Sequence, residues 1–269
     1  MEAVVNSARC LLYGRPNTCS EPVDEVLLGW TVTLLNEPCR GWYEVRTDYG
    51  YTGYIPASAL ALGEGNAKRW ASLDHRTVLR GICTLRSQPR VQGLRMETLL
   101  RGATVAVHGA PLADGWQKVS LPDGREGFTK TGYLGEIPTG LDEAALRDRV
   151  TQTARSYLGT HYDWSGKSPM GIDCSGLAFM AYRLSGVTIW RDSQIKAGYP
   201  IHAIDPARKQ PGDLLYFPGH VAVYLGDGEY IHSTGKDGSD GVVINSLDPG
   251  SPRFRPDLLE NLKAVGSLF

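Results

Sequence analysis

Short runs of hydrophobic and polar residues follow one another through the first half of the chain, and glycines separate these runs. Ala103, Val105 and Val107 show the two-residue period that is typical of a short strand. The same spacing occurs twice, because a Gly-to-Trp-to-Gly series at Gly29, Trp42 and Gly53 returns at Gly102, Trp116 and Gly127. A repeat of this size predicts two copies of one small all-β barrel, at residues 1–62 and 76–136, with a joint at 62–66.

The second half of the chain has a different pattern of apolar residues. Residues 141–158 carry a roughly helical apolar stripe, and a second helix follows Gly171 with Leu177, Met180, Ala181 and Leu184 on one face. Apolar runs bounded by glycine turns then predict strands at 213–217, 220–225, 230–232 and 242–244. Helices followed by antiparallel strands predict an α+β domain over residues 141–269, after a joint at 135–140.

Charge and composition narrow the function classes. The 28 Lys and Arg residues against 29 Asp and Glu residues leave a net charge of −1, which argues against a nucleic-acid partner or a polybasic membrane anchor. No run of 18 apolar residues is present, and the first residues lack the basic and apolar regions of a secretory signal. We therefore expect a cytoplasmic protein, or an exported one whose leader has been removed.

Cysteine usage excludes two further classes. The five cysteines are odd in number and never form a CxxC pair, which argues against a disulfide framework and a structural zinc site. Cys10, Cys19, Cys39 and Cys83 are expected to be small residues in or near the cores of the first half.

Cys174 stands apart from the other four. Asp173 is a plausible N-cap, which places Cys174 in the first turn of the second helix. Unpaired backbone N–H groups and the helix dipole favour a thiolate there, as a cysteine nucleophile requires. The position alone is equally compatible with a small buried residue.

Two histidines favour the catalytic interpretation. His220 opens one predicted strand and His232 ends the next, so a hairpin can place both imidazoles on one face of the sheet against the helix start. One histidine would take the thiol proton, and the other would contact the far ring nitrogen of the first and so keep it in the right tautomer. A zinc site formed by Cys174, His220 and His232 is chemically conceivable, but catalysis explains a cysteine at a helix start better, and we expect no metal or cofactor.

The motifs around these residues resemble those of the NlpC/P60 family, which has a papain-like fold. They are Asp173-Cys174-Ser175-Gly176, Gly219-His220-Val221 and Ile231-His232-Ser233, supported by Tyr162-Asp163-Trp164-Ser165-Gly166, Arg191-Asp192-Ser193-Gln194 and Pro211-Gly212-Asp213-Leu214. Ser165 departs from the glycine that the family often has.

The resemblance implies a cysteine peptidase that cuts the bond between γ-D-glutamate and a diamino acid in peptidoglycan stem peptides. Cys174 would be the nucleophile, His220 the base and His232 the residue that orients it, and the Cys174 N–H with the Tyr162 hydroxyl would hold the oxyanion.

The paired barrels resemble bacterial SH3 modules, an arrangement of the YkfC-like branch of the family. That branch implies a murein peptide substrate with a free N-terminal L-Ala, and therefore a role in murein recycling. A buried ammonium needs carboxylates. Asp173 and Asp192 with Ser193, and Glu25 with Tyr51 or Tyr54, are the candidates, while Ser175 could bind the substrate backbone. Otherwise Asp173 is only a cap, Glu25 a solvated charge and Tyr51 a surface aromatic.

Three other functions compete with the recycling peptidase. An exported hydrolase would act on intact cell wall through SH3-like wall-binding modules. A binding module with a dead catalytic domain is disfavoured by the intact Cys174, His220 and His232. Acyl transfer on the same papain-like scaffold would need an apolar channel, whereas the segments around Tyr162 and Asp192 are polar.

Overall fold

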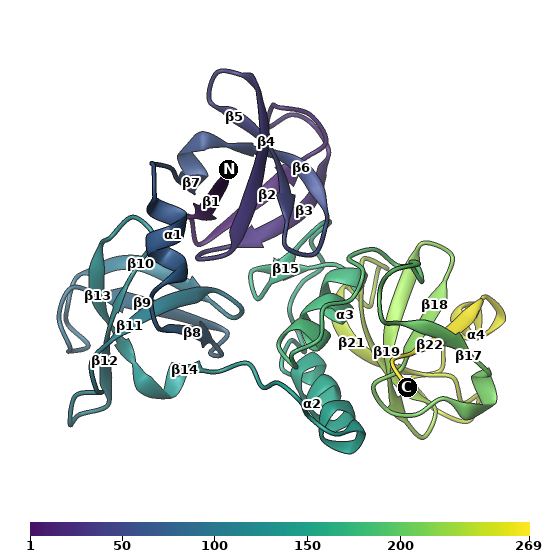
Figure 1. Ribbon diagram of the computed structural model, residues 1–269. Helices are drawn as coiled ribbons and strands as arrows, with labels where there is room; N and C mark the ends of the chain where they lie inside the picture. The colour runs from purple at the N-terminus through teal and green to yellow at the C-terminus, as the bar shows by residue number, and fades with distance from the viewer. The chain divides into compact units, whose positions relative to one another are not determined.

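The computed structural model describes all residues, 1–269, and divides into two compact units, 1–136 and 137–269 (Figure 1). The division falls inside the segment 135–140 that the sequence marks as a joint. Each unit is described by itself below.

The first unit begins with a seven-stranded antiparallel sheet in the order β3-β2-β6-β5-β4-β1-β7. Its strands are β1 (Glu2–Val5), β2 (Arg9–Tyr13), β3 (Pro22–Leu27), β4 (Thr31–Cys39), β5 (Trp42–Thr47), β6 (Thr52–Pro56) and β7 (Leu60–Ala61), with the short 3₁₀ helix η1 (Ala57–Ala59) before the last.

A second seven-stranded antiparallel sheet follows, in the order β10-β9-β13-β12-β11-β8-β14. Its strands are β8 (His75–Val78), β9 (Ile82–Arg86), β10 (Arg95–Leu100), β11 (Thr104–His108), β12 (Trp116–Ser120), β13 (Glu126–Lys130) and β14 (Leu134–Gly135), with η2 (Thr131–Tyr133) before the last. Strand for strand, this is the order of the first sheet, so the repeat of glycine and tryptophan in the sequence corresponds to a repeat of topology.

A short helix, α1 (Asn66–Ala71), connects the two sheets where the sequence indicated only a joint. Its Trp70 is buried against Val4 of the first sheet and Ala106 of the second, and the indole N–H donates to the Gly29 carbonyl at 3.1 Å. Gly29 has φ +80°, and a Cβ there would lie 2.2 Å from the Thr104 carbonyl oxygen, so only glycine allows this close approach.

Two of the cysteines expected in or near these cores lie at the surface. Cys83 is buried and Cys10 is partly buried, but Cys19 and Cys39 are exposed, so the prediction was wrong for them. Cys19 lies in the turn between β2 and β3 and Cys39 ends β4, where the chain projects away from the core. All five thiols are free.

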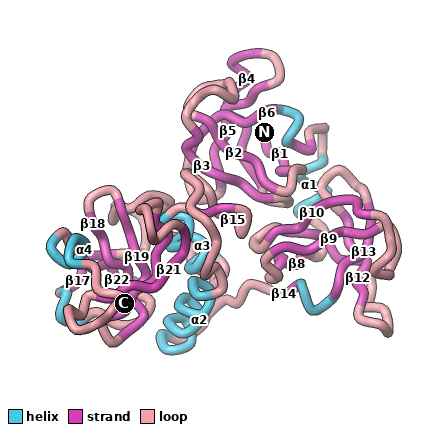
Figure 2. Tube along the Cα trace, turned by 180° about the vertical axis from the view of Figure 1, so that it is seen from behind, coloured by secondary structure: helices cyan, strands magenta, loops and turns pink.

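The second unit combines helices with a six-stranded antiparallel sheet in the order β17-β22-β18-β19-β20-β21 (Figure 2). The elements are α2 (Glu143–Arg155), β15 (Lys167–Ser168), β16 (Gly171–Ile172), α3 (Cys174–Arg183), β17 (His202–Ile204), η3 (Pro206–Arg208), β18 (Leu214–Phe217), β19 (His220–Gly226), β20 (Glu229–Thr234), β21 (Gly241–Ser246), α4 (Pro256–Glu260) and β22 (Ala264–Ser267). Both long helices and all four strands predicted from the sequence are present, with ends that differ by a few residues.

Helices α2 and α3 pack on each other and on the middle of the sheet, with α3 against β19 and β20. The stripe of α2 buries Leu146, Val150 and Ala154, while nine of the ten residues of α3 are buried. A second apolar cluster, which includes Leu215, Tyr224 and Tyr230, gathers residues from β18, β19, β20 and β22. The strands that carry the predicted histidines are therefore in the core of the unit.

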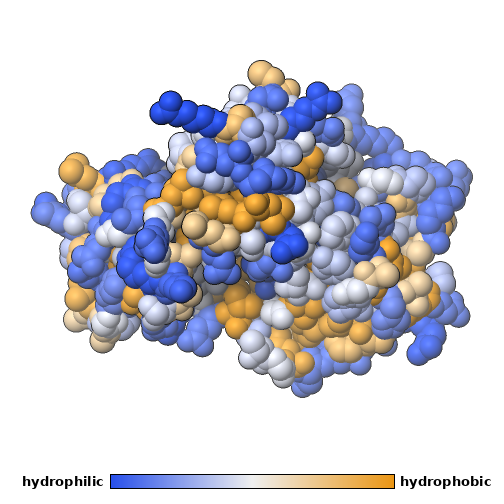
Figure 3. Space-filling view, turned by 45° about the horizontal axis from the view of Figure 1, so that its top comes forward, coloured by the Kyte–Doolittle hydropathy of each residue, from blue (hydrophilic) through white to orange (hydrophobic).

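No helix has the length and apolar character needed to cross a membrane. On the face shown in Figure 3, hydrophobic side chains gather in several regions, with hydrophilic ones around them.

Candidate active site

The start of α3 is fixed by the Asp173 carboxylate. Oδ1 accepts the Gly176 N–H at 2.6 Å, as expected of an N-cap, and also the Ser175 hydroxyl at 3.3 Å. Oδ2 accepts the Ser165 N–H at 2.9 Å. Asp173 thus holds the loop before the helix and the first turn in one arrangement, which confirms the cap predicted from the sequence.

Arg191 completes the network around Asp173. Its guanidinium donates to both carboxylate oxygens, at 3.1 Å and 2.9 Å, and to the Ser175 hydroxyl at 2.7 Å. Arg191 is 2% exposed and Asp173 6%, so this is a buried bidentate ion pair. With five donors around it, the Asp173 carboxylate is neutralised inside the protein, and an ammonium ion would have to displace one of these bonds.

Cys174 occupies the first position of α3 and is 7% exposed. Burial raises the pKa of its thiol to about 11, and the neighbouring Asp173 carboxylate adds to the rise. The backbone N–H groups of Val221 and Ser175 act in the opposite direction, because they donate to the sulfur. The thiolate expected from the helix start is therefore outweighed by burial, and at neutral pH the resting group is a thiol that needs a base.

The Val221 contact places the beginning of β19 at the cysteine, and His220 is the preceding residue. His220 Nε2 lies 2.7 Å from His232 Nδ1, and the two ring centroids are 4.9 Å apart. The hairpin of β19 and β20 therefore brings the two histidines together, as the sequence suggested.

Asn245 extends this chain by one more residue. Its Oδ1 lies 2.9 Å from His232 Nε2, while its Nδ2 donates to the Arg253 carbonyl at 3.2 Å, which fixes the orientation of the amide. Since an amide oxygen only accepts, His232 carries its proton on Nε2 and leaves Nδ1 as an acceptor. His220 must then donate from Nε2, which leaves its Nδ1 free of a proton and able to act as a base.

Burial keeps both rings neutral. It lowers the pKa of His220 to about 3, with His232 and Arg255 adding to the effect. It lowers the pKa of His232 to about 4, although the bond to Asn245 acts in the opposite direction. A neutral His220 whose Nδ1 has no proton is the state that can accept a proton from a thiol.

The other predicted residues of the second unit are Tyr162, Asp192 and Ser193, of which Tyr162 lies near the same helix start. Tyr162 is half-buried, and its hydroxyl pKa is raised by burial and by the nearby Cys174 and Asp173 groups. Asp192 and Ser193 are half-buried and directly follow Arg191. Ser165 has φ +67°, in the left-handed region, which explains why glycine suits this position.

Glu25 and Tyr51 lie in the first unit. Glu25 is completely buried, and one oxygen pairs with the Arg9 guanidinium at 3.0 Å. It is therefore not a solvated surface charge. Tyr51 is half-buried and its backbone N–H donates to the Thr47 hydroxyl at 3.0 Å.

The geometry of the histidines argues against a zinc site. Both nitrogens of His232 are engaged, one with His220 and one with Asn245, so this ring has no lone pair directed at an ion shared with Cys174. No group of three His, Cys, Asp or Glu side chains is arranged to hold a metal ion.

Two family models match the chain. Residues 159–252 match the NlpC/P60 family, a range that includes Cys174, His220, His232 and Asn245. Residues 12–60, in the first sheet, match the bacterial dipeptidyl-peptidase SH3 domain.

Similar proteins are known from bacteria. Dipeptidyl-peptidase 6 of Lysinibacillus sphaericus is 38% identical over 273 residues, which cover the whole of both chains. The gamma-D-glutamyl-L-lysine dipeptidyl-peptidase of Bacillus cereus is 28% identical over 231 residues, 78% of this chain and 66% of the relative. A solved structure of an NlpC/P60 family protein from Bacillus cereus, 22% identical, aligns with a TM-score of 0.80 over 98% of each chain, which shows a shared fold.

Proposed function

The chain belongs to the NlpC/P60 family of peptidoglycan-related peptidases, and from this premise we propose that it is a cysteine peptidase that cuts the γ-D-glutamyl bond to a diamino acid. The observation that carries the proposal is the hydrogen-bonded series His220, His232 and Asn245, together with the Val221 N–H, which donates to the Cys174 sulfur and brings the neighbouring His220 to the start of the helix. A thiol of high pKa beside a neutral imidazole with a free Nδ1 is suited to proton transfer during attack.

The proposed reaction has two steps. His220 Nδ1 accepts the Cys174 proton as the sulfur attacks the γ-carbonyl carbon, and the oxyanion is held by the Cys174 N–H, which has no acceptor within the helix, and by the Tyr162 hydroxyl. The C–N bond breaks as His220 returns the proton to the leaving amine, leaving a thioester on Cys174. A water molecule, deprotonated by His220, then attacks the thioester carbon, the C–S bond breaks to release the acid, and His220 returns the proton to the Cys174 sulfur.

The proposed substrate is a short peptide with a free N-terminal L-Ala followed by γ-D-Glu and a diamino acid. The support comes from two relatives, of Bacillus cereus and Bacillus subtilis, that carry the name gamma-D-glutamyl-L-lysine dipeptidyl-peptidase. Asp192 and Ser193 are the proposed recognition groups, because they adjoin Arg191 near the cysteine while Asp173 is already saturated. Such a substrate fits murein recycling in the cytoplasm.

The second sheet is proposed to be another copy of the SH3 module that matches the first. Its support is the identical strand order and the equivalent 3₁₀ helices η1 and η2, each directly before the last strand.

The function is tested by incubating the full chain with L-Ala-γ-D-Glu-L-Lys, its N-acetylated twin and intact sacculi, with the products followed by mass spectrometry. Cleavage of the free tripeptide alone, absent in Cys174→Ala, is expected. Equal cleavage of the acetylated peptide or of sacculi would instead indicate an exported hydrolase of intact wall. Cleavage that survives in Cys174→Ala would overturn the cysteine mechanism.

A further inference from the structure

A cleft of about 230 Å³ lies on the second sheet, between β9 and the β13–η2 segment. Arg80, Arg86 and Lys130 line it together with Trp116, Tyr133 and Ile82. Cys83 and Thr129 form a buried part of the lining. Nothing in the proposed peptidase reaction uses this cleft.

The charged groups of Arg80, Arg86 and Lys130 contact aromatic rings and backbone carbonyls, which carry no charge. The Arg80 guanidinium lies 5.8 Å from the centre of the Tyr133 ring, and the Lys130 ammonium 4.1 Å from that of Trp116. Lys130 also donates to the Asp114 carbonyl at 3.1 Å, and Arg86 to the Gly93 carbonyl at 2.9 Å. None of the three forms an ion pair with a carboxylate, so the cleft carries uncompensated positive charge.

The segment that contains Arg80 and Arg86 offers no carboxylate to neutralise them. Between Asp74 and Glu97 the chain has no acidic residue and five arginines, although the whole chain has a net charge of −1. Ile82 and Val91, which also line the cleft, are 52% and 63% exposed. The cleft therefore combines cationic and apolar surface.

The first sheet shows that the fold does not need these cations. Arg86 pairs with Phe128 in the second sheet as Tyr13 pairs with Tyr54 in the first, so Arg86 occupies the position of Tyr13. Lys130 faces Trp116 as Pro56 faces Trp42.

The same correspondence holds at the edge of the cleft. The Tyr133 carbonyl accepts the Leu79 N–H as the Ala59 carbonyl accepts the Asn6 N–H, which aligns Tyr133 with Ala59 and Arg80 with Ser7. The first sheet therefore forms the same backbone arrangement with small or uncharged residues at these positions. The fold does not require the positive charges that the second sheet has there.

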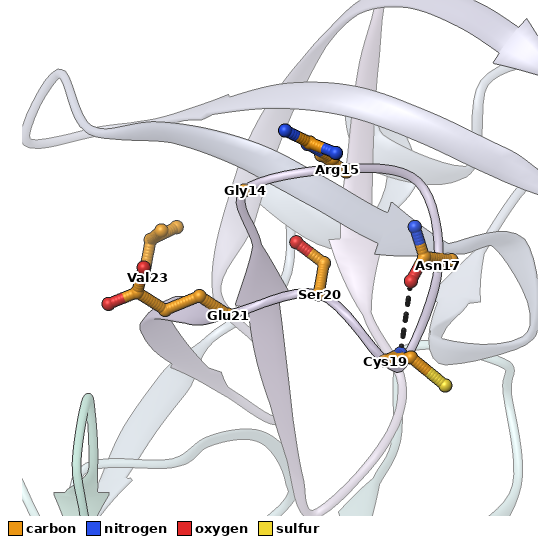
Figure 4. A pocket seen from close by; sticks show the side chains of 7 residues that line it. All are labelled: Gly14, Arg15, Asn17, Cys19, Ser20, Glu21 and Val23. Atoms are coloured by element: carbon orange, nitrogen blue, oxygen red, sulfur yellow. Dashed lines mark hydrogen bonds between the residues drawn. The ribbon is translucent and has the colours of Figure 1, made fainter.

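The first sheet has a hollow of its own at a different place, the turn between β2 and β3 (Figure 4). Arg15 and Glu21 both line it, and its turn is closed by the Cys19 N–H, which donates to Asn17 Oδ1 at 3.1 Å. Charges of both signs give that hollow no preference for an anion.

We propose that the cleft of the second sheet binds a short acidic peptide. Two or more carboxylates would pair with Arg80, Arg86 and Lys130, and the hydrocarbon parts of the peptide would lie on Ile82 and Tyr133. The guanidinium groups match carboxylates in bidentate geometry. Exposed apolar lining favours an organic anion over inorganic phosphate, which has no apolar surface to bury.

The test measures binding of fluorescein-labelled acetyl-Glu-Glu-Glu-amide to the full-length protein by fluorescence anisotropy, with acetyl-Gln-Gln-Gln-amide as the neutral twin. The variant Arg80→Ser/Arg86→Tyr introduces the residues that the first sheet has at these positions, so folding should be preserved. Arg40→Ser removes one exposed arginine of the first sheet, which does not line the cleft. Circular dichroism verifies that each variant is folded.

Binding of the Glu peptide but not of the Gln peptide, weakened by salt and about tenfold weaker in the double variant, is the expected result. Arg40→Ser should bind as the unchanged protein does. Equal binding of both peptides, or binding that the folded double variant retains, would overturn the proposal. Competition by tripolyphosphate at lower concentration than by unlabelled Glu peptide would overturn the assignment to a peptide. None of these outcomes depends on peptidase activity.

Discussion

Asn245 is the residue from which the protonation state of the site follows. Its amide is oriented by the Arg253 carbonyl, and its oxygen selects the tautomer of His232 and, through it, that of His220. Sequence reasoning found the two histidines because each stands beside a glycine turn or in a motif. Asn245 has no local signal, since it reaches His232 only because β21 pairs with β20 so that Asn245 faces Tyr230, two residues away.

We predict that Asn245→Ala lowers kcat/KM by about tenfold, because His232 can then adopt either tautomer. Asn245→Asp keeps an acceptor and adds a negative charge that stabilises the imidazolium form, so the acid limb of the pH–rate profile should move to higher pH. Steady-state kinetics across pH measures both effects. Asn261→Ala, an exposed asparagine of the same unit, is the matched control. Identical profiles for all three variants would refute the positioning role.

Arg191 has a structural role that the sequence analysis did not assign to it, although it belongs to the motif Arg191-Asp192-Ser193-Gln194. Asp192 and Ser193 were predicted as substrate contacts, yet Arg191 before them forms the buried pair with Asp173 that shapes the helix start. A buried arginine is rarely expected from sequence, because its partner lies 18 positions away.

Arg191→Met should lower the free energy of unfolding by about 3 kcal/mol, because it leaves the Asp173 carboxylate buried without a counter-charge. The double variant Arg191→Met/Asp173→Asn removes both charges and should recover part of that loss. Urea denaturation of the two variants and of Asp173→Asn gives the coupling. Additive losses would mean that the ion pair contributes no interaction of its own.

Among the elements, helix α3 depends on the close approach of a loop at Gly176. A Cβ at Gly176 would lie 2.2 Å from the Gly166 carbonyl oxygen and 3.0 Å from Asp173 Oδ1. The Asp-Cys-Ser-Gly motif thus contains a glycine for a steric reason, since it allows the loop 165–173 to lie against the first turn.

Gly176→Ala should therefore cost about 2 kcal/mol of stability and displace Asp173 from its capping position, with a loss of activity. Thermal unfolding and peptide cleavage are the measurements. Gly132→Ala, at a site with open space and an ordinary φ, is the control and should change neither. An active, fully stable Gly176→Ala protein would contradict the packing described for the helix start.

The elements themselves were predictable where hydrophobic periodicity is strong. Both long helices and the strands around His220 and His232 follow from the positions of apolar residues and glycine turns. Helix α1 was missed because only Trp70 of its six residues is buried, so it has no stripe to detect. The exposure of Cys19 and Cys39 was missed because a turn or hairpin end exposes whatever residue it carries.

At the scale of the whole molecule, the buried neutral histidines link stability to pH. The pKa values of His220 and His232 are about 3 and 4 in the folded protein, below the ordinary value of 6.5. Between the folded pKa values and 6.5, the unfolded chain therefore binds more protons than the folded protein. The contribution of the two histidines to the free energy of unfolding is fully present above pH 6.5 and falls as the pH drops toward 4.

We predict that the free energy of unfolding falls between pH 7 and about pH 4.5, and that His232 accounts for roughly 2 kcal/mol of the fall. His232→Gln, which cannot titrate, should show a correspondingly smaller decrease between the same two pH values. Urea denaturation at each pH supplies the four free energies. An equal decrease in both proteins would mean that His232 is not held neutral by the fold.

Whether Cys174 forms the covalent intermediate is tested most directly by intact-protein mass spectrometry after rapid acid quenching of a reaction with L-Ala-γ-D-Glu-L-Lys. The account predicts a transient adduct of L-Ala-γ-D-Glu joined as an acyl group, which peptide mapping places on Cys174 and which is absent in Cys174→Ala. Turnover of the tripeptide by Cys174→Ala at the rate of the unchanged protein, or an adduct on another residue, would contradict it.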